Sequence, residues 1–162
     1  MKTHLLIGLG LTLALASACY DPVHQDDVAA LGDEDPNVAP GAFHRPGQPC
    51  LTCHSGSGPG DAIFSIAGTA YQVRGGTLPL DSAMITITDA KGDSRGVLSN
   101  GAGNFFIRQS DWNPTYPVHV QLDSEDITRK MTTTIGRNGG CGTCHRAAGD
   151  RTFMPGVFLR DK

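Results

Sequence analysis

The chain has 162 residues and a formal net charge of −3 at neutral pH, which fits one domain with accessory segments. Beyond residue 42 it holds 12 Lys and Arg residues against 10 Asp and Glu residues, so this part is nearly neutral. The absence of a basic cluster excludes a nucleic-acid-binding surface.

Residues 1–18 are predicted to be a lipoprotein signal peptide. Lys2 precedes an apolar run over residues 5–16, and small residues lead up to Cys19, which is the layout of a secretory signal. The run is shorter than the roughly 20 apolar residues that a membrane-spanning helix needs. The stretch Leu15-Ala16-Ser17-Ala18-Cys19 resembles a bacterial lipobox, which implies that Cys19 is lipidated and begins the mature chain. The alternative is an ordinary signal cleaved near Ala18, which leaves Cys19 as a spare thiol.

Residues 19–42 are predicted to be an acidic flexible tether between the membrane and the domain. The segment has no Lys or Arg and few aromatic residues, so it cannot bury much apolar surface. Its six acidic residues are Asp21, Asp26, Asp27, Asp33, Glu34 and Asp35.

Two boxes of sequence CxxCH lie in the segments 43–61 and 137–162, which are predicted to bind haem. Two thiols three positions apart can each add across one vinyl group of a porphyrin, and the His that follows can bind the iron. The pattern is typical of c-type haem attachment, and His is a standard axial ligand of haem iron. We therefore expect two covalently bound haem c groups, held by Cys50, Cys53 and His54 and by Cys141, Cys144 and His145.

Three other chemistries use paired cysteines. A four-cysteine zinc site is disfavoured because 87 residues separate the two pairs, against the roughly 15–20 of a zinc ribbon. Two local disulfides are permitted in an exported protein. Thiol-redox catalysis is expected in a βαβ setting, which the sequence does not indicate. Only haem attachment also accounts for the His that follows each pair.

The opposite axial ligands are harder to assign. His44 lies six residues before the first box, a position from which small multihaem cytochromes often take a distal His, and Met131 lies ten residues before the second. The alternative is that His44 is an ordinary surface-loop residue and Met131 an ordinary core residue. Met154 is a weaker candidate, His119 is expected to be an ordinary strand residue, and His24 is expected to be solvated in the tether. The choice matters because His/Met ligation raises the reduction potential relative to His/His.

Residues 62–136 are predicted to form a single Ig-like or transthyretin-like β-sandwich, which makes the fold class mainly β. Short alternating runs end at turn residues, as in Ala83–Asp89 before Lys91-Gly92-Asp93. The stretches Ile66–Tyr71, Leu78–Asp89 and Asn100–Phe105 resemble the carboxypeptidase regulatory-like modules, although Ser82 replaces the usual Gly. That resemblance implies a fold and no catalytic residues.

The function predicted from these features is electron transfer by a dihaem cytochrome, not catalysis. It would be anchored as a lipoprotein on the periplasmic side of a bacterial membrane or on the cell surface, with other exported cytochromes as redox partners and no nucleic acid bound. No catalytic triad, phosphate loop or carboxylate pair is visible. A haem peroxidase or ligand sensor with an open iron position is one alternative, and a surface binding module built on the β-sandwich is the other.

Overall fold

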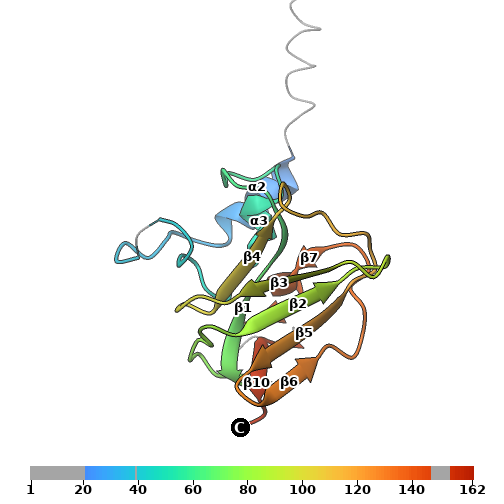
Figure 1. The fold of residues 1–162 in the computed structure, drawn as a ribbon. Helices are drawn as coiled ribbons and strands as arrows, with labels where there is room; N and C mark the ends of the chain where they lie inside the picture. Colours follow the sequence, from blue (N-terminus) through green and yellow to red (C-terminus); the bar gives the residue numbers. More distant parts are fainter. Residues whose placement is uncertain (1–20, 39, 147–153) are drawn as a thin grey trace, which may run out of the picture.

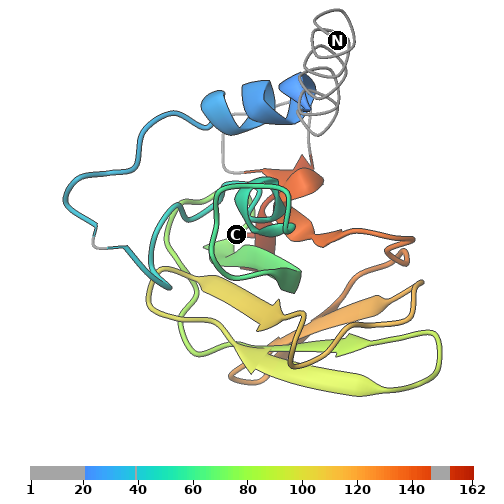
Figure 2. The same ribbon diagram turned by 90° about the horizontal axis from the view of Figure 1, so that it is seen from above.

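The computed structural model describes residues 21–38, 40–146 and 154–162, and its fold is mainly β, as predicted (Figure 1). Two sheets face each other in layers (Figure 2). The first sheet contains β1 (Phe64–Val73), β4 (Asn104–Arg108), β7 (Gly139–Gly140) and β10 (Val157–Arg160). Its central strand is β1, which lies between β4 and β10 and also pairs with β7. The second sheet has the order β3-β2-β5-β6, formed by β2 (Met84–Thr88), β3 (Ser94–Leu98), β5 (His119–Ser124) and β6 (Ile127–Lys130).

Apolar side chains from both sheets form one core. In β2, buried Ile85 and Ile87 alternate with more exposed residues, which is the period of a strand with one face buried. Phe105 from β4 and Leu159 from β10 reach the same core from the opposite sheet. Burying a side chain of this size contributes about 1.5–3 kcal/mol to stability, so the facing sheets stabilise each other.

Strand β1 differs from the other strands because seven consecutive residues in it are buried. One face carries Ile66 and Ala70 into the core between the sheets. On the other face, Thr69 Oγ1 accepts a hydrogen bond of 2.7 Å from the backbone N–H of Gly47. The segment before the first box therefore covers the outer face of β1.

On the side of β1 that faces away from β4, two later strands pair with it in turn. Ile66 and Ala67 pair in parallel with β7, and Ala70 to Val73 pair in parallel with β10. Between these strands the chain forms the 3₁₀ turn η1 (Cys141–Thr143) and the short pair β8 (His145–Arg146) and β9 (Met154–Pro155). The sandwich therefore does not end at residue 136, and the second box is an excursion between two strands of its first sheet.

The segment predicted to be a tether carries the helix α2 (Pro22–Ala29), which lies beside α3 (Leu51–His54) (Figure 2). Asp21 caps α2 by accepting hydrogen bonds from the N–H groups of Val23 and His24, and Pro22 occupies the first turn, where its missing N–H is not needed. Arg45 donates to the carbonyl oxygens of residues 31 and 32 and forms an ion pair with Glu34. The composition of the segment did not indicate this local structure.

The predicted signal peptide and Cys19 lie outside the described residues. In the part of the chain that is described, none of the helices has the length and apolar character needed to cross a membrane.

Candidate functional site

The first box forms a single helical turn directly before β1. Cys50 precedes α3 and Cys53 lies within it, so the two thiols, three positions apart, face the same side of the turn. Both are partly buried. The chain then folds back over the box, since the N–H of Gly60 donates to the carbonyl of Cys53 (3.0 Å) and a side chain at Gly60 would collide with the His54 ring.

The His54 ring is oriented by its backbone neighbour and by an aromatic side chain. Its Nδ1 lies 2.7 Å from the carbonyl oxygen of Ala62. Because a carbonyl can only accept a hydrogen bond, Nδ1 is the donor, and in the neutral ring Nε2 then keeps its lone pair. The ring of Phe64 stacks on His54 with the centroids 4.3 Å apart, and Phe106 continues the stack. Metal-binding histidines commonly have this arrangement, in which the second ring nitrogen donates to a carbonyl.

His44, the predicted opposite ligand, lies next to His54. The two ring centroids are 5.8 Å apart and the rings are inclined by 19°. The His44 backbone is fixed because its carbonyl accepts from Asn104 Nδ2 at 2.9 Å. His44, from before the box, and His54, from within it, therefore lie side by side.

His24 differs from its prediction as a solvated tether residue. The side chain is partly buried, and its Nε2 is shielded from solvent without a hydrogen-bond partner among the described residues. It lies on α2, the helix that packs beside α3 and hence beside the first box. The acidic composition of the segment gave no means of predicting this partial burial.

The second box continues directly from β7. Cys141 is buried at 8% exposure and packs on Gly68 of β1, where an added Cβ would lie 2.7 Å from the Cys141 Cβ. Cys144 is exposed. The Nδ1 of His145 lies 2.6 Å from the carbonyl oxygen of Pro155, so Nδ1 is again the donor, and the neutral ring keeps its lone pair on Nε2. The two box histidines thus have the same tautomer, fixed in the same way.

A cavity of about 360 Å³ opens beside the second box, within the range of small-molecule and cofactor pockets. Its walls come from both sheets and include apolar side chains of β2, β4, β5 and β10. Met131 and Met154, the two methionines considered as ligands, both line it together with Cys141, Cys144 and His145. His119 is an exposed residue of β5, as expected, and does not line the cavity.

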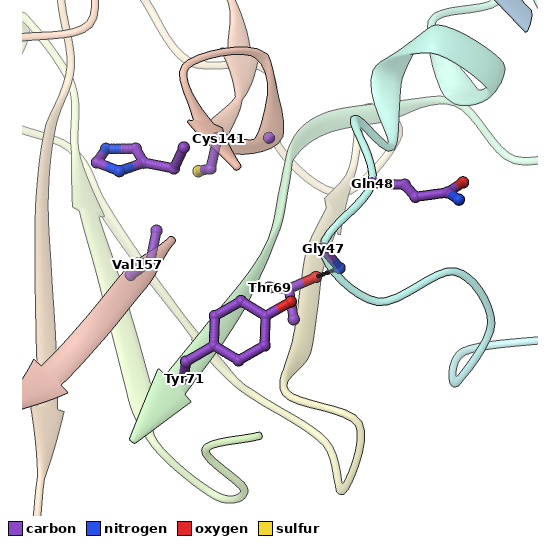
Figure 3. Close-up of a pocket in the computed structure, with 8 residues that line it drawn as sticks. Gly47, Gln48, Thr69, Tyr71, Cys141 and Val157 are labelled. Atoms are coloured by element: carbon purple, nitrogen blue, oxygen red, sulfur yellow. Dashed lines mark hydrogen bonds between the residues drawn. The ribbon is translucent and has the colours of Figure 1, made fainter. Parts of the chain in front are cut away.

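The two boxes touch each other although they are far apart in the sequence. A side chain added at Gly142 would lie 2.8 Å from the carbonyl oxygen of Gln48 and 2.9 Å from Pro49 Cα. Figure 3 shows Gly47 and Gln48, from before the first box, gathered around one hollow with Cys141 and Val157. Both boxes therefore lie at one region of β1, which serves as their common support.

The state of the thiols bears on the alternative chemistries. All four box cysteines are free. Burial raises the pKa of the Cys50 thiol to about 11. Burial, and to a smaller extent the nearby Cys50, raises the pKa of the Cys141 thiol to about 12. Redox-active thiols have a lowered pKa instead. Within the described residues no three His, Cys, Asp or Glu side chains converge as a metal-binding group.

Several residues that position the boxes were not identified from the sequence. Asn104 is buried, accepts from Thr69 Oγ1 at 2.8 Å and donates to the carbonyls of Ala42 and His44. The amide of a buried Asn needs hydrogen-bond partners. An Asn at the start of an apolar strand was the one sequence feature that could have indicated this role. The carbonyls of Ala62 and Pro155 left no signal, because any residue type can supply them.

Comparison with protein-family models, with curated proteins and with solved structures finds no match to this chain.

Proposed function

We propose that this protein is an exported c-type cytochrome that carries electrons on two covalently attached haem groups. The observation that carries the proposal is that each CxxCH box holds its His with Nδ1 on a backbone carbonyl and Nε2 available. The same arrangement at two independent boxes is expected for two iron ligands and is not required by the fold.

The residues around the first box fit a haem with two His ligands. The His44 and His54 rings are stacked neighbours with centroids 5.8 Å apart, and each would have to turn its Nε2 toward the iron for both to bind it. The stack of Phe64 and Phe106 provides apolar surface beside this pair. His24, with its unpartnered Nε2, is the competing ligand.

The residues around the second box fit a haem with a His ligand and a Met ligand. The adjoining cavity is lined by apolar side chains, both box thiols, His145, Met131 and Met154. A porphyrin needs such an apolar enclosure with few polar groups. Since a porphyrin itself supplies four iron ligands, the protein needs to bring only one or two side chains to each iron.

Each part of the chain has a definite role in this proposal. Bound haem supplies one-electron chemistry between ferric and ferrous iron. In attachment, each cysteine thiol adds across one vinyl group, with sulfur bonding to one carbon and hydrogen to the other, so nothing is oxidised or released. The carbonyls of Ala62 and Pro155 orient the ligand rings, and β1 holds both boxes together. Lipid on Cys19 would keep the carrier at a membrane near other exported redox proteins.

The test is expression with the c-type maturation machinery, followed by mass measurement of the intact protein. The expected mass corresponds to two haems, and substitution of either cysteine pair (C50A/C53A or C141A/C144A) should remove one. A folded protein without haem would overturn the proposal. Substitution of Cys19 should release the protein from the membrane fraction and leave its two haems in place.

One observation favours a second candidate, a haem protein that binds a small ligand. The cavity beside His145 contains two methionines, and it leaves room at the iron if neither binds. Addition of CO to the reduced protein, or of peroxide to the oxidised protein, distinguishes the two. Unchanged spectra indicate an electron carrier with both irons saturated, and a spectral shift indicates an open position.

A further inference from the structure

The cavity beside the second box is lined by side chains of three kinds. Cys141, Cys144 and His145 line it, and apolar side chains from both sheets form the walls. Three cationic residues also line it, namely Arg74, Arg129 and Lys130. A cavity with thiols, an apolar body and cations fits a ligand that is apolar along its length and anionic at one edge.

The register of the first sheet separates the thiols from the arginines. Cys141 packs on Gly68, whereas Phe158 of β10 pairs with Tyr71, three residues further along β1. At roughly 3.3 Å per residue, this is about 10 Å. The guanidinium carbons of Arg74 and Arg129 lie 4.8 and 5.6 Å from the centre of the Phe158 ring. Figure 1 shows β10 and β6 beside each other at this end of the sandwich.

The arginine pair already binds a carboxylate in this structure. Asp161 bridges the two residues, with its oxygens 3.2 Å from Arg74 Nε and 2.7 Å from Arg129 Nη2. Arg129 is held in place because its Nε donates to the carbonyl of Leu159 at 2.7 Å. The ion pairs are largely exposed, at 41–58% for the side chains involved. Exposed ion pairs contribute only about 0–1 kcal/mol, so a second carboxylate can replace or join Asp161 at little cost.

We propose that Arg74 and Arg129 bind the propionate carboxylates of the haem attached at the second box, at the place where Asp161 binds here. This inference rests on the proposed function. Arg is suited to the role because its planar fork binds a carboxylate through two parallel hydrogen bonds. The apolar walls and the cysteines then hold the opposite, hydrophobic edge of the haem.

The test uses the intact two-haem protein and its reduction potentials. Reduction adds an electron, and nearby cations stabilise the reduced state, so R74Q and R129Q should each lower the midpoint potential of one haem. The expected change is about three- to tenfold in the reduction equilibrium constant, where tenfold corresponds to about 59 mV. D161N should raise the potential of the same haem, because it removes a negative charge close to the arginines and the propionates.

Arg160 provides the matched control, since it pairs with Glu125 (2.6 Å) and does not line the cavity. R160Q should leave both potentials unchanged. The carboxylate contact itself is read from redox-difference infrared spectra with ¹³C-labelled propionates: R129Q and R129K should shift the labelled bands, and R160Q should not. R129K keeps the charge and should largely preserve the potential.

Two outcomes would overturn the inference. One is a pair of potentials that R74Q and R129Q leave unchanged, and the other is a set of propionate bands that neither substitution moves. Each sample is weighed first by mass spectrometry. Two attached haems with unaffected potentials reject the arginine site alone, whereas a mass without haem rejects the proposed function.

Discussion

The two box histidines are oriented by backbone carbonyls and not by side chains. Ala62 and Pro155 supply these carbonyls at 2.7 and 2.6 Å, and both lie on segments that return to the box after it has formed. A neutral carbonyl fixes the ring and its tautomer without adding a charge beside the metal ligand. Each imidazole thus presents Nε2 to the iron that we propose it binds.

The opposite ligand of the first haem can be tested by substitution. If His44 is that ligand, H44M converts a His/His pair into a His/Met pair and raises the reduction potential. We expect a change on the order of 100 mV, within the about 0.8 V that axial ligands span, together with a change in the ferric spectrum. H119M is the control, because His119 is an exposed residue of β5. A response to H24M in place of H44M would assign the ligand to His24.

Ser82 has a backbone conformation that favours glycine. Its φ is +56°, in the left-handed region, and it occupies the position where the resembling β-sandwich modules have Gly. A non-glycine residue loses roughly 1–2 kcal/mol there, of which the greater chain entropy of glycine offsets about 0.5–1 kcal/mol. S82G should therefore raise the free energy of unfolding by about 1 kcal/mol in denaturant titrations. S82A keeps the strain, so an equal gain from S82A would contradict this explanation.

Among the elements, β1 connects the fold to the site. Ile66 and Ala70 belong to the core between the sheets, while Thr69 on the other face binds the segment before the first box. Its edge pairs with β7 and β10, which begin and end the excursion that holds the second box. Since one strand supports both boxes, the sandwich acts as the rigid element that sets their relative position.

Asp89 stabilises the turn after β2 in a pH-dependent way. Its carboxylate accepts hydrogen bonds from the backbone N–H groups of Lys91, Asp93 and Thr115, at 2.8–3.0 Å. These bonds, that from Thr115 above all, lower the pKa of Asp89 below its ordinary value. The stabilisation is therefore complete above the unfolded-state pKa of about 4 and is lost as the pH falls through the lower folded-state pKa.

Substitution at Asp89 should remove this dependence. D89N should lower the denaturation midpoint at pH 7 and lose less stability than the unsubstituted protein when the pH falls from 5 to 3. Urea titrations at several pH values measure both effects. The same substitution at Asp126, an exposed residue of the β5–β6 turn, should change neither. An unaltered pH profile in D89N would show that Asp89 does not contribute to acid sensitivity.

The sequence predicts the local features of this fold better than its long-range pairings. The alternation in β2 and the run Phe105-Phe106-Ile107-Arg108 predict strands that the structure contains. The parallel pairing of β10 with β1 was missed, because a four-residue strand after the second box has no periodic signal and its partner lies more than 80 residues away. For the same reason the predicted end of the β-sandwich at residue 136 was wrong, since it separates β7 and β10 from the rest of their sheet.

The residues of the candidate site likewise fall into those that the sequence indicates and those that only the structure reveals. Spacing and residue type select the box residues as candidates, because the proposed attachment chemistry needs only five consecutive positions. Of the candidates for the opposite ligand, His44 lies next to His54 and Met131 lines the cavity beside the second box. The partial burial of His24 and the arginine pair around Asp161 depend on contacts between distant segments, which neither spacing nor composition specifies.

At the scale of the whole molecule, the main feature is that the two boxes are neighbours. Gly142 lies against Gln48 and Pro49, and the Cys50 and Cys141 thiols are close enough for the charge of one to affect the other. A haem attached at each box would therefore have its attached edge beside the other haem. Electrons could pass between the two haems inside one molecule, and charge on one haem would affect the reduction of the other.

This proximity predicts that the two haems do not titrate independently. At an effective dielectric constant of about 20, two unit charges roughly 10 Å apart interact by about 1.7 kcal/mol. That is somewhat more than tenfold in an equilibrium constant, or upwards of about 59 mV for one electron. The haem that is reduced first in the intact protein should therefore have a potential higher, by roughly this amount, than in a variant that carries it alone, because its neighbour is still ferric.

Spectroelectrochemical titration of the intact protein and of the two single-haem variants, C50A/C53A and C141A/C144A, measures this difference. Two variants are used because Cys141 is buried in the core and its loss can destabilise the fold. Electron paramagnetic resonance of the intact protein gives an independent reading, since a nearby ferric centre broadens the signal of its neighbour and half-reduction should sharpen it. Equal potentials in the intact and single-haem proteins, with no broadening, would mean that the haems extend away from each other despite the contact between their boxes.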